Sequence, residues 1–183
     1  LTDISNKLFN CFTFDKVNIL YSPPGTGKTT LFSKLAETKR VCVVMPYTSI
    51  IENKIETKEE ITKHFKVVYG DTKIDVREST NSYVMTFDKF SQIEICDYDT
   101  FDEIVIDESH LLFTSSYREE MCSNVIGNIR SYLDEVETKK KMSSTLEHNY
   151  LLSSPLDEML DGSVKSPNIT LMSGTPIGEL SFF

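Results

Sequence analysis

A glycine-rich segment that ends in lysine and threonine is the strongest chemical signal in this sequence. Residues 22–29 are Ser-Pro-Pro-Gly-Thr-Gly-Lys-Thr, and they directly follow the apolar run 17–21. The glycines at positions 25 and 27 permit backbone angles and close approaches that a Cβ atom would obstruct. Consecutive backbone N–H groups can then surround phosphate oxygens, and the start of a following helix adds positive potential. The segment therefore predicts a nucleoside triphosphate site.

The individual residues of this phosphate loop have separate expected tasks. Lys28 is expected to reach the β- and γ-phosphates, and the Thr29 hydroxyl to ligate magnesium. The residues predicted to bind the ATP phosphates are Pro24, Gly25, Thr26, Gly27, Lys28, Thr29 and Thr30. Ser22 stands where the usual pattern has its first glycine, a position that shapes the entry to the loop. A tight turn with a chance lysine is the alternative, which the strand and helix signals on either side disfavour.

Two adjacent carboxylates form the second chemical signal. Asp107 and Glu108 directly follow the apolar run 104–106, and His110 lies two residues further on. Hydrolysis of a nucleoside triphosphate needs one carboxylate in the magnesium shell and another to orient and deprotonate the attacking water. Asp107 fits the first role and Glu108 the second, although such a pair after a strand is also common in simple turns. Its position downstream of a phosphate loop favours the catalytic interpretation.

The elements that must position these motifs follow from hydrophobic patterns. Six short apolar runs predict strands at 17–21, 41–45, 66–69, 83–86, 104–106 and 169–172. Between them, three- and four-residue periodicity predicts helices at 29–38, 49–64 and 117–136. Continuously apolar strands that alternate with helices indicate an α/β fold with a parallel sheet covered on both faces. In such folds ligands bind at the carboxyl ends of the strands, where each motif lies.

The polar residues after the third predicted helix are expected to form an exposed turn. They comprise three consecutive lysines at 139–141 and two serines at 143–144. Three lysines in a row usually form a solvated surface, and contact with a nucleic-acid backbone is the less favoured interpretation.

Composition limits the class of protein. The 183 residues are 39% hydrophobic and 26% charged, which predicts one globular domain over 1–183. The net charge of −9 excludes a broad basic surface for nucleic acid, because phosphate neutralisation needs clustered Lys and Arg. Any nucleic-acid binding must then be local, through backbone amides and a few hydroxyls, or be shared with a partner domain.

The cysteines and the hydropathy pattern predict an intracellular location. Cys11, Cys42, Cys96 and Cys122 lie far apart in the sequence, so buried reduced thiols are expected in place of a zinc site or a disulfide framework. The longest apolar run, 41–45, is far shorter than the roughly 20 residues that span a bilayer. No charged-then-apolar leader is present. We therefore expect a cytoplasmic protein, or one in an intracellular host compartment if it is viral, with no secretion and no membrane partner.

Residues 107–110, Asp-Glu-Ser-His, together with 173–176, Ser-Gly-Thr-Pro, resemble the DExH branch of superfamily-two helicases and translocases. The resemblance covers about 17–176, and it implies a motor core over about 17–178. The segment between the two motifs is longer than usual for this family, which implies a helical insertion at about 113–166. The resemblance also implies the first RecA-like domain of an ATP-dependent helicase: a three-layer sandwich of the P-loop NTPase type with a mainly parallel central sheet. The implied cofactors are ATP and Mg²⁺, and the implied partner is single- or double-stranded DNA or RNA.

The same resemblance assigns roles to individual residues. It implies catalytic roles for Lys28, Asp107, Glu108 and His110, with Thr29 and Asp107 as magnesium ligands. Ser173, Gly174 and Thr175 match the motif that links the nucleotide site to the nucleic-acid track. Pro46, Tyr47, Thr48 and Thr86 match turns that contact the sugar-phosphate backbone in relatives.

The sequence also departs from the pattern of this family and is compatible with two other classes of protein. The phosphate loop also suits an AAA+ ATPase, and a nucleotide-binding module without hydrolysis would keep the same residues. Gln92 is the only glutamine, so the element that reads adenine in DEAD-box relatives is missing and base selectivity is open. The family's second RecA-like domain, which carries a catalytic arginine, is not found in this chain. We therefore expect residues 1–183 alone to hydrolyse ATP poorly.

Overall fold

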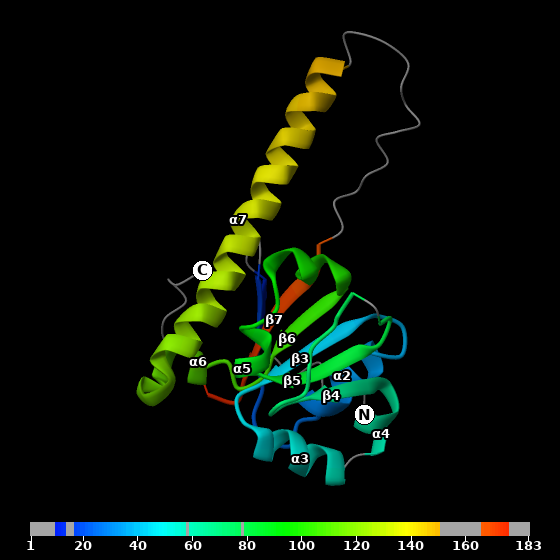
Figure 1. The fold of residues 1–183 in the computed structure, drawn as a ribbon, viewed down its shortest axis with the longest axis vertical. Helices are drawn as coiled ribbons and strands as arrows, with labels where there is room; N and C mark the ends of the chain where they lie inside the picture. The colour runs from blue at the N-terminus through cyan, green and yellow to red at the C-terminus, as the bar shows by residue number, and fades with distance from the viewer. Residues whose placement is uncertain (1–9, 14–16, 58, 78, 151–165, 176–183) are drawn as a thin grey trace.

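A central β-sheet organises the chain (Figure 1). The computed structural model describes residues 10–13, 17–57, 59–77, 79–150 and 166–175. Within these residues the sheet has seven strands in the order β1-β2-β7-β6-β3-β5-β4. The strands are β1 (Asn10–Thr13), β2 (Val17–Tyr21), β3 (Val41–Met45), β4 (Phe65–Val68), β5 (Ser82–Thr86), β6 (Glu103–Ile106) and β7 (Asn168–Ser173).

The six predicted strands are confirmed, with boundaries that agree within one residue. All six pair in parallel with their neighbours, as continuously buried apolar strands favour. The short strand β1 was not predicted, and it pairs antiparallel with β2 at one edge of the sheet. The predicted mainly parallel sheet is therefore correct.

Helices cover both faces of the sheet and complete three layers (Figure 1). On one face, α2 (Lys28–Leu35), α3 (Thr48–Thr57) and α4 (Glu59–His64) share a buried core with Val41, Val43 and Met45 of β3. The alternate β3 residues Cys42 and Val44 belong to the core on the other face. That core includes α5 (Phe87–Phe90), the 3-10 helix η1 (Ile95–Thr100), α6 (Leu111–Thr114) and α7 (Glu119–Tyr150). A further 3-10 helix, η2 (Ser116–Arg118), joins α6 to α7.

The helix predicted over 49–64 is confirmed on both sides of residue 58, which lies outside the described residues and separates two described helices. The first of them, α3, ends at Thr57, and α4 begins at Glu59. Ile51 of α3 and Ile61 of α4 both belong to the same core.

The exposed turn predicted at 139–144 is wrong, because these residues continue α7. Lysine has a high helix propensity, and two i,i+4 ion pairs, Glu135–Lys139 and Glu137–Lys141, stabilise this part of the helix. The apolar face predicted for the helix is confirmed by the burial of Val125, Ile129, Tyr132 and Val136. Beyond that face α7 projects past the sheet (Figure 1), and Met142 is exposed.

The predicted insertion at 113–166 is helical as far as Tyr150, and residues 151–165 lie outside the described residues. None of the helices in the described ranges is both long and apolar enough to cross a membrane.

The expectation of buried cysteines holds in part. Cys42 and Cys122 are buried, and burial raises the pKa of both thiols above the ordinary value. Cys96 is exposed, so the expectation is wrong at this position. It lies in η1, a surface turn, where its Sγ accepts a hydrogen bond from Arg77 (3.0 Å). The Cys11 side chain lies outside the described part of the structure.

The packing of α7 on the sheet yields a stability prediction. Ile129 is fully buried in this interface, so Ile129→Ala removes buried methylene groups and leaves a cavity. We expect the free energy of unfolding to fall by about 2–5 kcal/mol in urea denaturation. Met142→Ala in the same helix is the control and should leave stability nearly unchanged, since Met142 is 61% exposed. Equal stability of the Ile129 variant and the unsubstituted protein would show that α7 does not dock as described.

Candidate functional site

The three predicted motifs meet at the carboxyl ends of β2, β7 and β6. Strand β7 lies between the other two, with Tyr21 opposite Ser173 in the register with β2. Past the strand ends, the Ser22 amide donates to the Ser173 carbonyl over 3.0 Å. The Ser109 amide donates to the Met172 carbonyl over 2.9 Å. Strand β7 therefore joins the phosphate loop to residues 107–110, the acidic or DExH segment.

The phosphate loop has an open, glycine-dependent backbone. Gly25 and Gly27 have φ angles of 78° and 93°, in the left-handed region that favours glycine. A Cβ atom built at either glycine would have no heavy atom within 4 Å, so the loop surrounds free space. Helix α2 starts at Lys28, with Gly27 as its N-cap. A left-handed loop that leads into a helix N-terminus is a favourable site for an anion such as phosphate.

Hydrogen bonds inside the loop hold it in shape. The ammonium group of Lys28 donates to the carbonyls of Ser22 (2.7 Å) and Pro23 (3.3 Å). The hydroxyls of Ser22 and Thr26 are hydrogen-bonded to each other, and Thr26 Oγ1 also donates to the Pro23 carbonyl over 2.7 Å. Ser22, the departure from the usual pattern, is buried and so closes the base of the loop.

The two carboxylates of the acidic segment, Asp107 and Glu108, differ in burial and in backbone conformation. Asp107 is 1% exposed, and its amide continues the sheet by donating to the Val44 carbonyl over 2.8 Å. Its Oδ1 atom accepts from the Glu108 amide over 3.0 Å. Glu108 is half-buried and has a φ of 50°, an uncommon angle for a residue other than glycine. A backbone held in a sparsely populated region where a predicted catalytic carboxylate lies fits a functional site.

Lys54 of α3 is a site residue that sequence reasoning missed. Its ammonium nitrogen lies 2.6 Å from Oδ2 of Asp107 and 5.5 Å from the centre of the Phe32 ring. The Lys54 side chain is 20% exposed. A buried carboxylate needs a compensating positive charge, and Lys54 provides it. No local signal marks this lysine, because the pairing depends on how α3 packs against the sheet.

His110 connects the acidic segment to the end of β7. Its Nδ1 atom lies 2.9 Å from the Ser173 hydroxyl and 3.5 Å from Oε2 of Glu108. The Ser173 hydroxyl also accepts from the Thr175 amide over 3.0 Å. A Cβ atom built on Gly174 would lie 3.7 Å from the Lys28 ammonium nitrogen. The predicted coupling motif 173–175 therefore touches both nucleotide-handling segments.

The turns predicted to contact nucleic acid lie after β3 and β5. Tyr47 and Thr48 are half-buried, and Pro46 is buried. Thr86 is 4% exposed, and its hydroxyl caps α5 by accepting from the Lys89 amide over 3.4 Å. The nucleic-acid role of these four residues stays a prediction, and for Thr86 the side chain serves the helix in this structure. Arg118, which sequence reasoning did not identify, contacts the turn after β3 and the helix α5 that begins directly after Thr86.

The oxygen atoms at this edge fit a magnesium ion. Mg²⁺ prefers oxygen ligands and usually keeps several waters while it bridges one or two protein groups to phosphates. Thr29 and Asp107 offer a hydroxyl and a carboxylate, and both are buried. Across the described residues no group of three or more His, Cys, Asp or Glu side chains forms a metal cage. A magnesium ion that arrives with a nucleotide needs no such cage.

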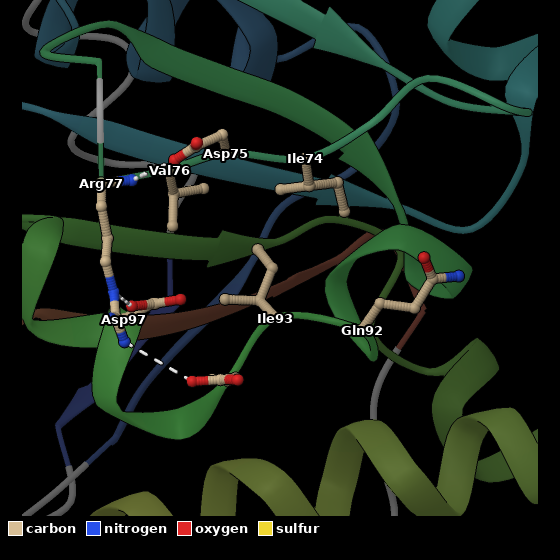
Figure 2. A pocket seen from close by; sticks show the side chains of 8 residues that line it. Ile74, Asp75, Val76, Arg77, Gln92, Ile93 and Asp97 are labelled. Carbon is tan, nitrogen blue, oxygen red and sulfur yellow. Dashed lines mark hydrogen bonds and ion pairs between the residues drawn. The ribbon is translucent and has the colours of Figure 1, made fainter.

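A separate hollow lies between residues 74–77 and 92–97 (Figure 2). Arg77 crosses it and pairs with Asp97 and with Glu94, whose Oε2 atom is 3.5 Å from Nη2. The neighbouring Val76 carbonyl accepts a hydrogen bond from Arg40, which directly precedes β3. The hollow therefore lies toward the amino ends of the strands, away from the motifs, and we assign it no part in the site.

Comparison with known proteins agrees with this arrangement. A family model described as DEAD/DEAH box helicase matches residues 2–179. No curated protein sequence matches the chain. The SWI2/SNF2 ATPase core of Sulfolobus solfataricus, solved in complex with double-stranded DNA, aligns with 98% of this chain and 31% of its own at 16% identity and a TM-score of 0.50. This likeness shows the fold, which is RecA-like.

Two structures of bacteriophage T4 UvsW also align. One covers 86% of this chain and 26% of its own, at 14% identity and a TM-score of 0.48. The other, of the UvsW helicase, covers 87% and 46%, at 12% identity and a TM-score of 0.45. The chain therefore spans less than half the length of each of these three solved structures.

The Lys54–Asp107 pair yields a second stability prediction. Lys54→Met removes the ammonium group and leaves a buried carboxylate without a compensating cation, so the free energy of unfolding should fall by about 3 kcal/mol, the lower end for buried pairs. Adding Asp107→Asn removes the unpaired charge, so the double variant should be more stable than Lys54→Met alone. Urea denaturation of both variants measures this. A Lys54→Met protein as stable as the unsubstituted one would show that the pair does not compensate Asp107.

Proposed function

Because this chain belongs to the DEAD/DEAH box helicase family, we propose that the whole protein is a motor that couples ATP hydrolysis to movement along nucleic acid or to its unwinding. One observation carries the proposal: strand β7 brings residues 173–175 into contact with both the phosphate loop and the DExH segment. An AAA+ ATPase or a module without hydrolysis is disfavoured by the family match.

In this proposal the phosphate loop binds ATP. Lys28 exchanges its hydrogen bonds to the Ser22 and Pro23 carbonyls for phosphate oxygens, because a phosphate offers the ammonium group a full negative charge. Residues 24–30 supply backbone N–H groups and hydroxyls around the phosphates. Thr29 and Asp107 hold the accompanying Mg²⁺, which supplies charge neutralisation on the phosphates.

Glu108 is the proposed general base. A water molecule attacks the γ-phosphorus, the bond to the bridging oxygen of ADP breaks, and Glu108 takes the proton that the water loses. His110 lies between Glu108 and Ser173, so a change at the catalytic carboxylate is transmitted to the end of β7. This path is the proposed link between hydrolysis and the nucleic-acid track.

The proposed nucleic-acid track follows the turn at 46–48 and the junction at Thr86 between β5 and α5. Both lie at the same edge of the sheet as the nucleotide site, because β3 and β5 are parallel neighbours. The net charge of −9 supports local contacts to the sugar-phosphate backbone in place of a broad basic surface. The proposal covers single- and double-stranded DNA or RNA, without a choice between them.

A second RecA-like domain is part of the proposal. Efficient phosphoryl transfer uses an arginine that stabilises the transition state and contributes roughly 10³–10⁵ in rate. In this proposal Lys28, Asp107 and Glu108 of this chain act at the nucleotide site, and the arginine comes from the second domain. Residues 1–183 alone would then bind nucleotide weakly and hydrolyse it slowly.

The role of Glu108 is directly testable in the full-length protein. Glu108→Gln should keep ATP binding but lower the rate of hydrolysis by about 10²–10⁴, the usual contribution of a general base. Lys28→Ala should instead lose ATP affinity, since it removes the cation from the phosphate loop.

The matched control for this experiment is Glu103→Gln. Glu103 is the first residue of β6, so it lies at the end of the strand that is opposite Glu108. Glu103 pairs with Lys39 (2.7 Å), and its neutralisation should leave hydrolysis nearly unchanged. Steady-state phosphate release and fluorescent-nucleotide binding give the two readouts. Unimpaired hydrolysis in Glu108→Gln would remove Glu108 as the base.

A further inference from the structure

Arg118 lies at a junction of three segments that are far apart in the sequence. It is the last residue of η2, eight positions after His110. One guanidinium nitrogen donates to the Pro46 carbonyl after β3, and another pairs with the Asp88 carboxylate of α5. The guanidinium carbon also lies 5.4 Å from the centre of the Tyr47 ring. A single side chain thus contacts the predicted nucleic-acid turn after β3 and the helix α5 that begins directly after Thr86.

The burial of Arg118 indicates a structured contact in place of a loose surface pair. Its side chain is 17% exposed, whereas Asp88 is 55% exposed. The planar guanidinium group can donate in two directions at once and stack on an aromatic ring, which a lysine cannot reproduce. Such a side chain fixes the separation and orientation of the groups that it joins.

The segment that carries Arg118 is also connected to the catalytic residues. Helix α6 starts directly after His110, and the Leu111 and Leu112 amides donate to the Glu108 and Ser109 carbonyls over 3.0 Å each. The Arg118 amide donates to the Ser115 carbonyl over 3.2 Å, so η2 continues from this short helix. A displacement of the DExH segment would therefore move Arg118 and, with it, the turn after β3 and helix α5.

We propose that Arg118 is a positioning residue that holds the turn at 46–48 and the junction at Thr86 in their nucleic-acid-binding arrangement and connects them to the DExH segment. This inference rests on the proposed function, because it requires that these two segments bind nucleic acid. It assigns Arg118 a role in nucleic-acid affinity and in the coupling of binding to hydrolysis, but none in binding of the nucleotide itself.

The test measures binding of a fluorescent single-stranded oligonucleotide and of ADP to the full-length protein and its variants. Arg118→Met keeps the aliphatic stem but removes the donors, and it should weaken oligonucleotide binding on the order of tenfold, because the binding segments are no longer held in place before the oligonucleotide arrives. Arg118→Lys should lie between Arg118→Met and the unsubstituted protein, because an ammonium group can keep the Asp88 pair alone. ADP affinity should be unchanged in both variants.

Two further variants separate positioning from general charge or folding effects. Asp88→Asn weakens the same junction from its exposed side and should also reduce oligonucleotide affinity. Arg130→Met removes one positive charge from the exposed surface of α7, twelve residues or about 18 Å further along the chain than Arg118. This variant should leave oligonucleotide affinity unchanged.

The outcomes distinguish this inference from the proposed function. If the unsubstituted protein binds no oligonucleotide, the proposed function fails and this inference with it. If the protein binds and Arg118→Met binds equally well, only the inference fails. The inference is also overturned if Arg118→Met loses ADP affinity to the same extent, which would indicate a general structural role, or if Arg130→Met weakens oligonucleotide binding equally.

Discussion

The position of β7 between β2 and β6 is the constraint on which the rest of this structure depends. Parallel pairing aligns the carboxyl ends of the three strands, so residues from positions 22, 107 and 173 meet at one edge. Two backbone hydrogen bonds past the strand ends, from Ser22 to Ser173 and from Ser109 to Met172, extend this alignment into the loops. A nucleotide bound at this edge would contact elements that lie far apart in the sequence.

The second constraint is the charge balance at that edge. Asp107 is almost fully buried, and a buried carboxylate is costly unless a cation accompanies it. Lys54 supplies the cation from α3, the helix that begins at the turn proposed to contact nucleic acid. Mg²⁺ at Asp107 would share the carboxylate with this lysine. Asp107, the proposed magnesium ligand, is thus connected through one ion pair to the helix that begins at the proposed nucleic-acid turn.

Local sequence patterns were sufficient for the sheet and for the phosphate loop, because the relevant forces act over a few residues. Residues 41–45 are all apolar and form a fully buried strand, and the Gly25 and Gly27 backbone angles require glycine. The Lys54–Asp107 pair could not be predicted, since 53 residues separate the partners and only the packing of α3 brings them together. The end of α7 was missed because a run of lysines suits a solvated helix as well as a turn.

The central claim is that His110 and Ser173 couple hydrolysis to the nucleic-acid track through the end of β7. The most direct measurement is a double-mutant cycle of His110→Ala and Ser173→Ala on nucleic-acid-stimulated ATP hydrolysis by the full-length protein. The account predicts that each single variant loses most of the stimulation, and that the double variant loses no more than the worse single one. Losses that multiply in the double variant would show that the two residues act independently and would contradict the account.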